Sequence, residues 1–75
     1  MDTEAYQIVV KGMGITKHIN INKNLTINNM LVNLFEEGYR DKVLTYNYKI
    51  LDGLDKIKDC LEDGALVEVG TTVDS

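Results

Sequence analysis

The sequence predicts an α+β fold in which a mixed four-stranded sheet packs on one helix. Apolar residues alternate with polar ones over residues 6–11, 16–22 and 65–69, which is typical of strands with one buried face. Between these segments the apolar period changes to that of a helix, over residues 27–35. A chain of 75 residues with 44% hydrophobic content has room for one core. We therefore expect a single domain over residues 1–75, with flexible tails at 1–4 and 71–75.

The N-terminal pattern predicts a hairpin. Residues 6–11 are β-branched or aromatic at most positions, and residues 16–22 alternate strictly. Between them Gly12-Met13-Gly14 supplies residues that tolerate positive φ. The expected inward side chains are Tyr6, Ile8, Val10, Ile19 and Ile21.

The helix has the clearest local pattern. Its apolar residues fall at i, i+3, i+4, i+7 and i+8, which makes one stripe for packing on a sheet: Ile27, Met30, Leu31, Leu34 and Phe35. Thr26 precedes the stripe and suits an N-cap. Gly38 follows it and suits the left-handed position that closes a helix.

The C-terminal half predicts two more strands and a helical turn. Residues 43–51 alternate and predict a third strand, with Leu44, Tyr46, Tyr48 and Ile50 on one face and Thr45, Asn47 and Lys49 on the other. The spacing of Leu54, Ile57 and Leu61 predicts a short helical turn. Residues 65–69 predict the last strand, with Ala65, Val67 and Val69 inward.

This element order limits the topology. The order is strand, strand, helix, strand, short helix, strand, and a single helix can cover only one face of the sheet. The simplest arrangement pairs the last strand in parallel with the first, which is the β-grasp topology. Another small α+β roll with the same order stays open.

Three segments resemble the ubiquitin-like superfamily: residues 6–11, its opening strand; 25–34, its threonine-capped helix; and 61–69, the turn and closing strand. The intervening lengths are most similar to the sulfur carriers of thiamine and molybdopterin synthesis. Those carriers, like conjugated ubiquitins, end in Gly-Gly, whose carboxylate is adenylated. Here residues 70–75 read Gly-Thr-Thr-Val-Asp-Ser, so the chain as written is not expected to be a carrier.

Composition argues against several classes of function. The net charge is −4 and the eight basic residues are scattered, which disfavours nucleic-acid binding. No segment approaches the roughly 20 apolar residues of a membrane span. Cys60 is the one cysteine and cannot form an internal disulfide, so we expect a cytoplasmic protein.

Catalytic and ligand-binding chemistry is not predicted. His18 and Cys60 are the single residues of their types, and no nucleophile and base can be paired. His18 is expected to be solvated on the second strand, and Cys60 to be a half-buried small hydrophobe or an exposed thiol. Five carboxylates are interleaved with Lys56 and Lys58 and lack the spacing of a calcium loop: Asp52, Asp55, Asp59, Glu62 and Asp63. We therefore expect no enzyme activity, no cofactor and no metal site.

The remaining candidate is a surface for another protein. Val9 and Leu66 fall out of phase with the inward residues of two strands expected to be neighbours, and Thr45 and Asn47 lie next to them on the third strand. Residues 16–22 would form an exposed edge that offers main-chain pairing. The sequence thus predicts a non-enzymatic protein-interaction module. Two alternatives stay open: a degenerate or processed sulfur or modifier carrier, and a small acidic inhibitor of a host enzyme, encoded by a phage or not. The partner and the oligomeric state are also open.

Overall fold

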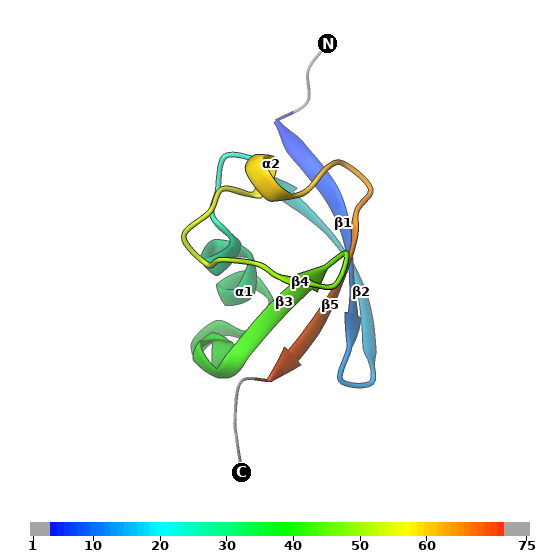
Figure 1. Cartoon of the computed structure of the whole chain (residues 1–75), viewed down its shortest axis with the longest axis vertical. Coiled ribbons are helices and arrows are strands. Elements are labelled where there is room, and N and C mark those ends of the chain that lie inside the picture. The colour runs from blue at the N-terminus through cyan, green and yellow to red at the C-terminus, as the bar shows by residue number, and fades with distance from the viewer. Residues whose placement is uncertain (1–3, 72–75) are drawn as a thin grey trace.

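The computed structural model describes residues 4–71 and contains a five-stranded mixed sheet with one long helix (Figure 1). The strands lie in the order β2-β1-β5-β3-β4. In chain order the elements are β1 (Ala5–Gly12), β2 (Ile15–Asn22), α1 (Ile27–Phe35), the 3-10 helix η1 (Glu36–Asp41), β3 (Lys42–Tyr46), β4 (Lys49–Ile50), α2 (Ile57–Cys60) and β5 (Leu66–Thr71). This is the predicted β-grasp fold, with one strand more than expected.

The pairing that defines this topology is confirmed. β1 and β2 form an antiparallel hairpin, and β5 pairs in parallel with β1 at the centre of the sheet. The hairpin turn uses three consecutive residues with positive φ, namely Gly12 at 139°, Met13 at 52° and Gly14 at 77°. β2 is one edge of the sheet, as predicted, and the short β4 is the other.

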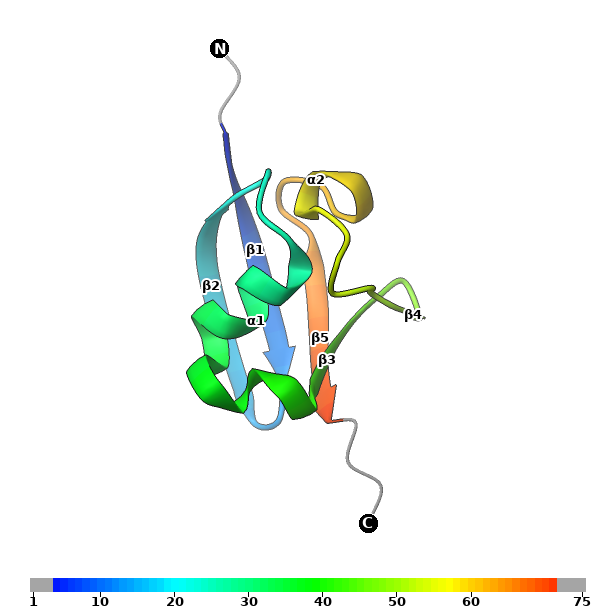
Figure 2. The same cartoon turned by 90° about the vertical axis from the view of Figure 1, so that its left-hand side faces the viewer.

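The core lies between α1 and one face of the sheet (Figure 2). The helix contributes the predicted stripe, of which Ile27, Met30 and Leu31 are buried while Leu34 and Phe35 pack at the margin. The sheet contributes alternate residues of its strands: Ile8, Val10, Ile21, Leu44, Val67 and Val69. Alternation therefore predicted these six sheet residues of the core correctly. Tyr6 and Ile19 are only partly buried against it.

The start of α1 is as predicted, and its end is not. Thr26 is the N-cap: its Oγ1 accepts a hydrogen bond from the Asn29 amide at 3.2 Å, and the Asn29 side chain accepts one from the Thr26 amide at 3.0 Å. The helix ends at Phe35, before Gly38, because Glu36 takes the positive φ of 53°. The chain then continues as the 3-10 helix η1.

The predicted third strand over residues 43–51 is two strands joined by a turn. β3 ends at Tyr46, Asn47 and Tyr48 both have positive φ, and β4 returns antiparallel to β3. Two consecutive left-handed residues are the requirement of a tight hairpin whose twist matches that of its strands. The prediction of a single strand, and of inward Tyr48 and Ile50, is therefore wrong. The alternation of residue types continues without a break through the turn, so it gives no sign that the chain reverses there.

The segment between β4 and β5 contains the predicted helical turn in a shorter form. α2 buries Ile57, and the following Leu61 is buried too, but Leu54 lies outside α2 and is exposed. The segment is fixed to the start of α1 by main-chain hydrogen bonds, from Ile27 to Asp55 and from Ile57 to Leu25. α2 therefore closes the end of the core where α1 begins.

Most of the two predicted tails, residues 1–3 and 72–75, lies outside the described residues. Of the others, the Glu4 carbonyl accepts a hydrogen bond from the Lys23 amide, and Thr71 ends β5 opposite Lys42. No helix within residues 4–71 is long and apolar enough to cross a membrane.

Candidate protein interface

The face of the sheet that α1 does not cover, here called the open face, carries the predicted site. Residues between the buried ones of each strand project there, since neighbouring side chains alternate across a sheet. Val9, Leu66 and Thr45 occupy such positions on three successive strands, β1, β5 and β3. The open face is made by Gln7, Val9, Lys11, His18, Thr45, Ile50, Leu66 and Glu68.

Val9 and Leu66 are register partners in the parallel β1–β5 pair, as predicted. Leu66 is 52% exposed, and Val9 is partly covered by its neighbours. A hydrogen-bond network fixes their positions at the start of β5: Asp63 Oδ1 accepts from the Gln7 amide at 2.8 Å, and the Ala65 carbonyl accepts from the Val9 amide at 3.0 Å. The two apolar side chains are therefore held side by side without a covering element.

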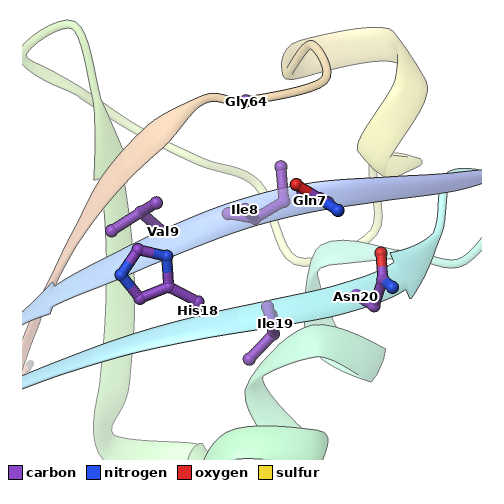
Figure 3. Close-up of a pocket in the computed structure, with 7 residues that line it drawn as sticks. All are labelled: Gln7, Ile8, Val9, His18, Ile19, Asn20 and Gly64. Atoms are coloured by element: carbon purple, nitrogen blue, oxygen red, sulfur yellow. The ribbon is translucent and has the colours of Figure 1, made fainter.

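Val9 lines a shallow concavity of about 270 Å³ between β1 and β2 (Figure 3). His18, the register partner of Val9, stands beside it, and Gln7, Asn20 and Gly64 complete the rim. This hollow, the Val9 concavity, has an apolar floor with amide and imidazole groups around it. His18 is exposed, as predicted.

The other three predicted residues meet in a second hollow of about 320 Å³, the Tyr48 concavity, at the opposite side of the open face. It is lined by Thr45, Tyr46, Asn47, Tyr48, Leu66 and Glu68. Leu66 separates the two hollows, because it pairs with Val9 on one side and lines the Tyr48 concavity on the other. The structure thus brings Thr45, Asn47 and Leu66 to one place and puts Val9 next to it.

The Tyr46 side chain packs at the margin of the core and makes one hydrogen bond. The Tyr46 hydroxyl donates to Glu62 Oε1 at 3.2 Å, which links β3 to the turn before β5. Partial burial raises the pKa of Tyr46, and the Glu62 carboxylate raises it further, so the hydroxyl stays protonated and keeps donating.

Sequence reasoning missed Tyr48, Ile50 and Glu68 as members of this surface. Tyr48 is fully exposed and Ile50 is 72% exposed, although both were expected inward. Ile50 pairs with Thr45, so it belongs to the open face. The signal that could have found Tyr48 and Ile50 is Asn47, since asparagine tolerates the left-handed conformation and favours a hairpin turn at that point.

The remaining chemistry-bearing residues do not gather. Within residues 4–71, no three His, Cys, Asp or Glu side chains lie so as to hold a metal ion. Cys60 has a free thiol and is half-buried against the core, which is the first of the two predicted environments, with its Sγ 3.4 Å from the Lys56 carbonyl oxygen. Burial raises the pKa of Cys60, and Asp55 and Asp59 raise it further.

Comparison with known proteins supports the fold. The sequence matches no protein-family model and no curated protein. Among solved structures it is similar to the N-terminal ubiquitin-like domain of the 4931431F19Rik protein, with a TM-score of 0.83, 18% identity, and coverage of 99% of this chain and 81% of that one. A structure described as molecular mimicry of SUMO that promotes DNA repair has a TM-score of 0.82 and 16% identity, with coverage of 93% of this chain and 95% of that one. The ubiquitin of Caldiarchaeum subterraneum has a TM-score of 0.81 and 14% identity, with coverage of 93% of this chain and 96% of that one. The chain therefore has the ubiquitin-like β-grasp fold.

Proposed function

We propose that this protein is a non-enzymatic interaction module that binds another protein through its open face. The observation that supports it is the pair of Val9 and Leu66, apolar side chains on the uncovered side of the sheet. Leu66 is 52% exposed, and burying that surface against a partner is favourable while leaving it in water is not. Because Cys60 is a free thiol, the reducing cytoplasm is the proposed location.

The geometry suits recognition of a folded surface or a short segment. The open face presents apolar groups at its centre and polar groups around them, which is the anatomy of protein interfaces. The two concavities on either side of Leu66 offer places for a partner's side chains. The strands that carry these residues are fixed by the sheet, so binding requires little ordering of the module.

The test is partner capture with matched variants. The immobilised chain is used to isolate a partner from the source cells, and its affinity is then measured for Leu66→Asp and for Val32→Asp. Val32 lies on α1 and is 42% exposed, so the control places the same charge at a similarly exposed apolar position away from the open face. We expect Leu66→Asp to weaken binding by about 1–3 kcal/mol and Val32→Asp to leave it unchanged.

The carrier alternative predicts a different result. A carrier would engage its activating enzyme through its C-terminal tail, so removal of residues 72–75 would abolish binding. This truncation leaves β5 whole, because Thr71 is its last residue. Binding that survives Leu66→Asp and is lost on truncation would overturn the proposed function.

The acidic-inhibitor alternative depends on the net charge of −4. Electrostatic docking on a basic site weakens steeply as salt rises, whereas burial of Val9 and Leu66 does not. Binding measured at low and high ionic strength separates the two. A large loss at high salt, with no effect of Leu66→Asp, would favour the inhibitor.

A further inference from the structure

The Tyr48 concavity combines three kinds of side chain. Leu66 supplies an apolar wall, Tyr48 an aromatic ring and Glu68 a carboxylate. They come from the β3–β4 turn, at the sheet edge opposite β2, and from the central strand β5 (Figure 2). The volume of about 320 Å³ is at the low end of the range for ligand pockets, roughly 300–1,000 Å³, and suits one side chain of a partner.

Tyr48 is an unusual residue for its position. Its φ of 66° is left-handed, which is costly for a bulky residue and is ordinarily taken by glycine or asparagine. Its ring is fully exposed, so no packing within the described residues offsets that cost. A large aromatic side chain presented in this way is typical of an anchor in a binding surface.

Glu68 supplies a negative charge that forms no ion pair within residues 4–71. The only ion pair among residues 4–71 joins Lys42 and Asp41, so Glu68 has no ionic partner there, although Lys11 is its neighbour across the β1–β5 pair. Glu68 is also the one charged residue that lines the concavity. The hollow is therefore complementary to a positive group.

We propose that the Tyr48 concavity binds an arginine side chain of the partner protein, an inference that rests on the proposed function. The guanidinium lies on the Tyr48 ring and donates hydrogen bonds to the Glu68 carboxylate, while the aliphatic stem of the arginine packs on Leu66. Arginine fits better than lysine because its planar group stacks on an aromatic face and donates two parallel hydrogen bonds to one carboxylate.

Capped tripeptides test this proposal without knowledge of the partner. The probes are acetyl-Leu-Arg-Leu-amide and the same peptide with citrulline, which has nearly the shape of arginine and no charge. Backbone amide shifts of the ¹⁵N-labelled chain are followed during titration. We expect the arginine peptide to shift the amides of residues 45–49 and 66–68 at roughly millimolar concentration, and to bind roughly tenfold tighter than the citrulline peptide.

Variants of the chain sharpen the assignment. Glu68→Gln and Tyr48→Gly should each weaken the arginine peptide about threefold, and Tyr48→Phe should retain its binding because the ring remains. Tyr48→Gly is also expected to relieve the left-handed backbone, and its thermal midpoint, measured on the same sample, separates a loss of binding from unfolding. Equal binding of arginine and citrulline peptides, shifts confined to the Val9 concavity, or no effect of Glu68→Gln would overturn the proposal. A lysine peptide that binds as tightly as the arginine peptide would overturn the choice of arginine.

Failure of this inference is distinguishable from failure of the proposed function. If the peptides do not bind selectively but the captured partner still depends on Leu66, only the arginine assignment falls. If the arginine peptide binds as expected and the partner is indifferent to Leu66→Asp, the assignment of the open face as the partner's interface falls.

Discussion

Leu44 and Leu66 are the same residue type on neighbouring strands of one sheet, yet they have opposite roles. Leu44 projects from β3 toward α1 and is fully buried, whereas Leu66 projects from β5 to the open face and is 52% exposed. The difference arises because one helix can cover only one face of a sheet. Side chains on the covered face determine stability, and those on the open face are available for a partner.

The largest expected effect is on the covered face. Leu44→Ala should lower the free energy of unfolding by about 2–5 kcal/mol, because it leaves a cavity in a core to which residues 4–71 contribute only twelve buried hydrophobic side chains. Urea denaturation monitored by circular dichroism measures the change. In a domain of this size such a loss is a large share of the total stability. A loss below about 1 kcal/mol would mean that Leu44 does not face the helix.

The hairpin turn should be the next most sensitive place. Gly12 has φ of 139°, and a Cβ there would collide with the Val69 carbonyl oxygen of the central strand β5. Gly12→Ala should therefore cost about 1–3 kcal/mol. Gly14→Ala is the control, since its φ of 77° is also positive but a Cβ there meets nothing within 4 Å. Equal losses of stability in both variants would show that the close approach to Val69 does not matter.

Leu66→Ala makes the same change on the open face that Leu44→Ala makes on the covered face. We expect a loss of at most about 1 kcal/mol, since only part of this side chain leaves water on folding and the remaining cost is the lower strand preference of alanine. The same urea denaturation applies to both variants. A loss that matches that of Leu44→Ala would contradict the assignment of two faces with separate roles.

Tyr48→Gly should act in the opposite direction. Glycine removes the cost of the left-handed backbone at φ 66°, and this gain exceeds the extra freedom that glycine gives the unfolded chain. Stability should rise by about 0.5 kcal/mol, visible as a higher thermal midpoint. A decrease would indicate that the exposed ring packs on the domain and is not reserved for a partner.

The smallest effect concerns Cys60, at the margin of the core. Its pKa is raised by burial and then by Asp55 and Asp59, so less thiolate is present near pH 8 than for a free cysteine. Alkylation by iodoacetamide should be slower in the native chain than in the urea-unfolded chain at that pH. Asp59→Asn should accelerate it modestly, whereas removal of the distant Asp41 carboxylate should not.

The same shift links Cys60 to stability in a defined direction. A raised pKa favours the thiol, so its contribution is complete below the pKa of the unfolded chain and is lost as the pH rises through the higher native value. Stability that increased over this alkaline range, relative to a Cys60→Ala variant, would contradict the assigned direction.

Much of the fold could be predicted from the sequence because its signals are local. The stripe from Ile27 to Phe35, the Thr26 cap and the alternation in β1 and β5 each depend on residues a few positions apart. These patterns set which side chains are buried. Together with the small size of the chain, they favoured a topology in which β5 lies beside β1, and the structure confirms that pairing.

The candidate site could be predicted only in part, for the same reason. Alternation identified Val9 and Leu66 as outward, and the parallel pairing confirmed them as neighbours. It failed at Tyr48 and Ile50, because period 2 runs unbroken through a two-residue turn and carries no mark of the reversal except Asn47. The end of α1 was also misplaced. Gly38 was the expected left-handed residue, whereas Glu36 takes that conformation and η1 follows.

The sequence by itself determined the class of fold, the helix and its cap, and the two alternating sets of strand residues, because local sterics and the burial of apolar groups act on near neighbours in the chain. Only the tertiary structure decided which outward residues meet. Leu66 and Glu68 join Thr45, Asn47 and Tyr48 in one hollow through the antiparallel β3–β5 register, which pairs residues as far apart in the sequence as Lys42 and Thr71. That register depends on the packing of the whole sheet against α1, and no local pattern encodes it.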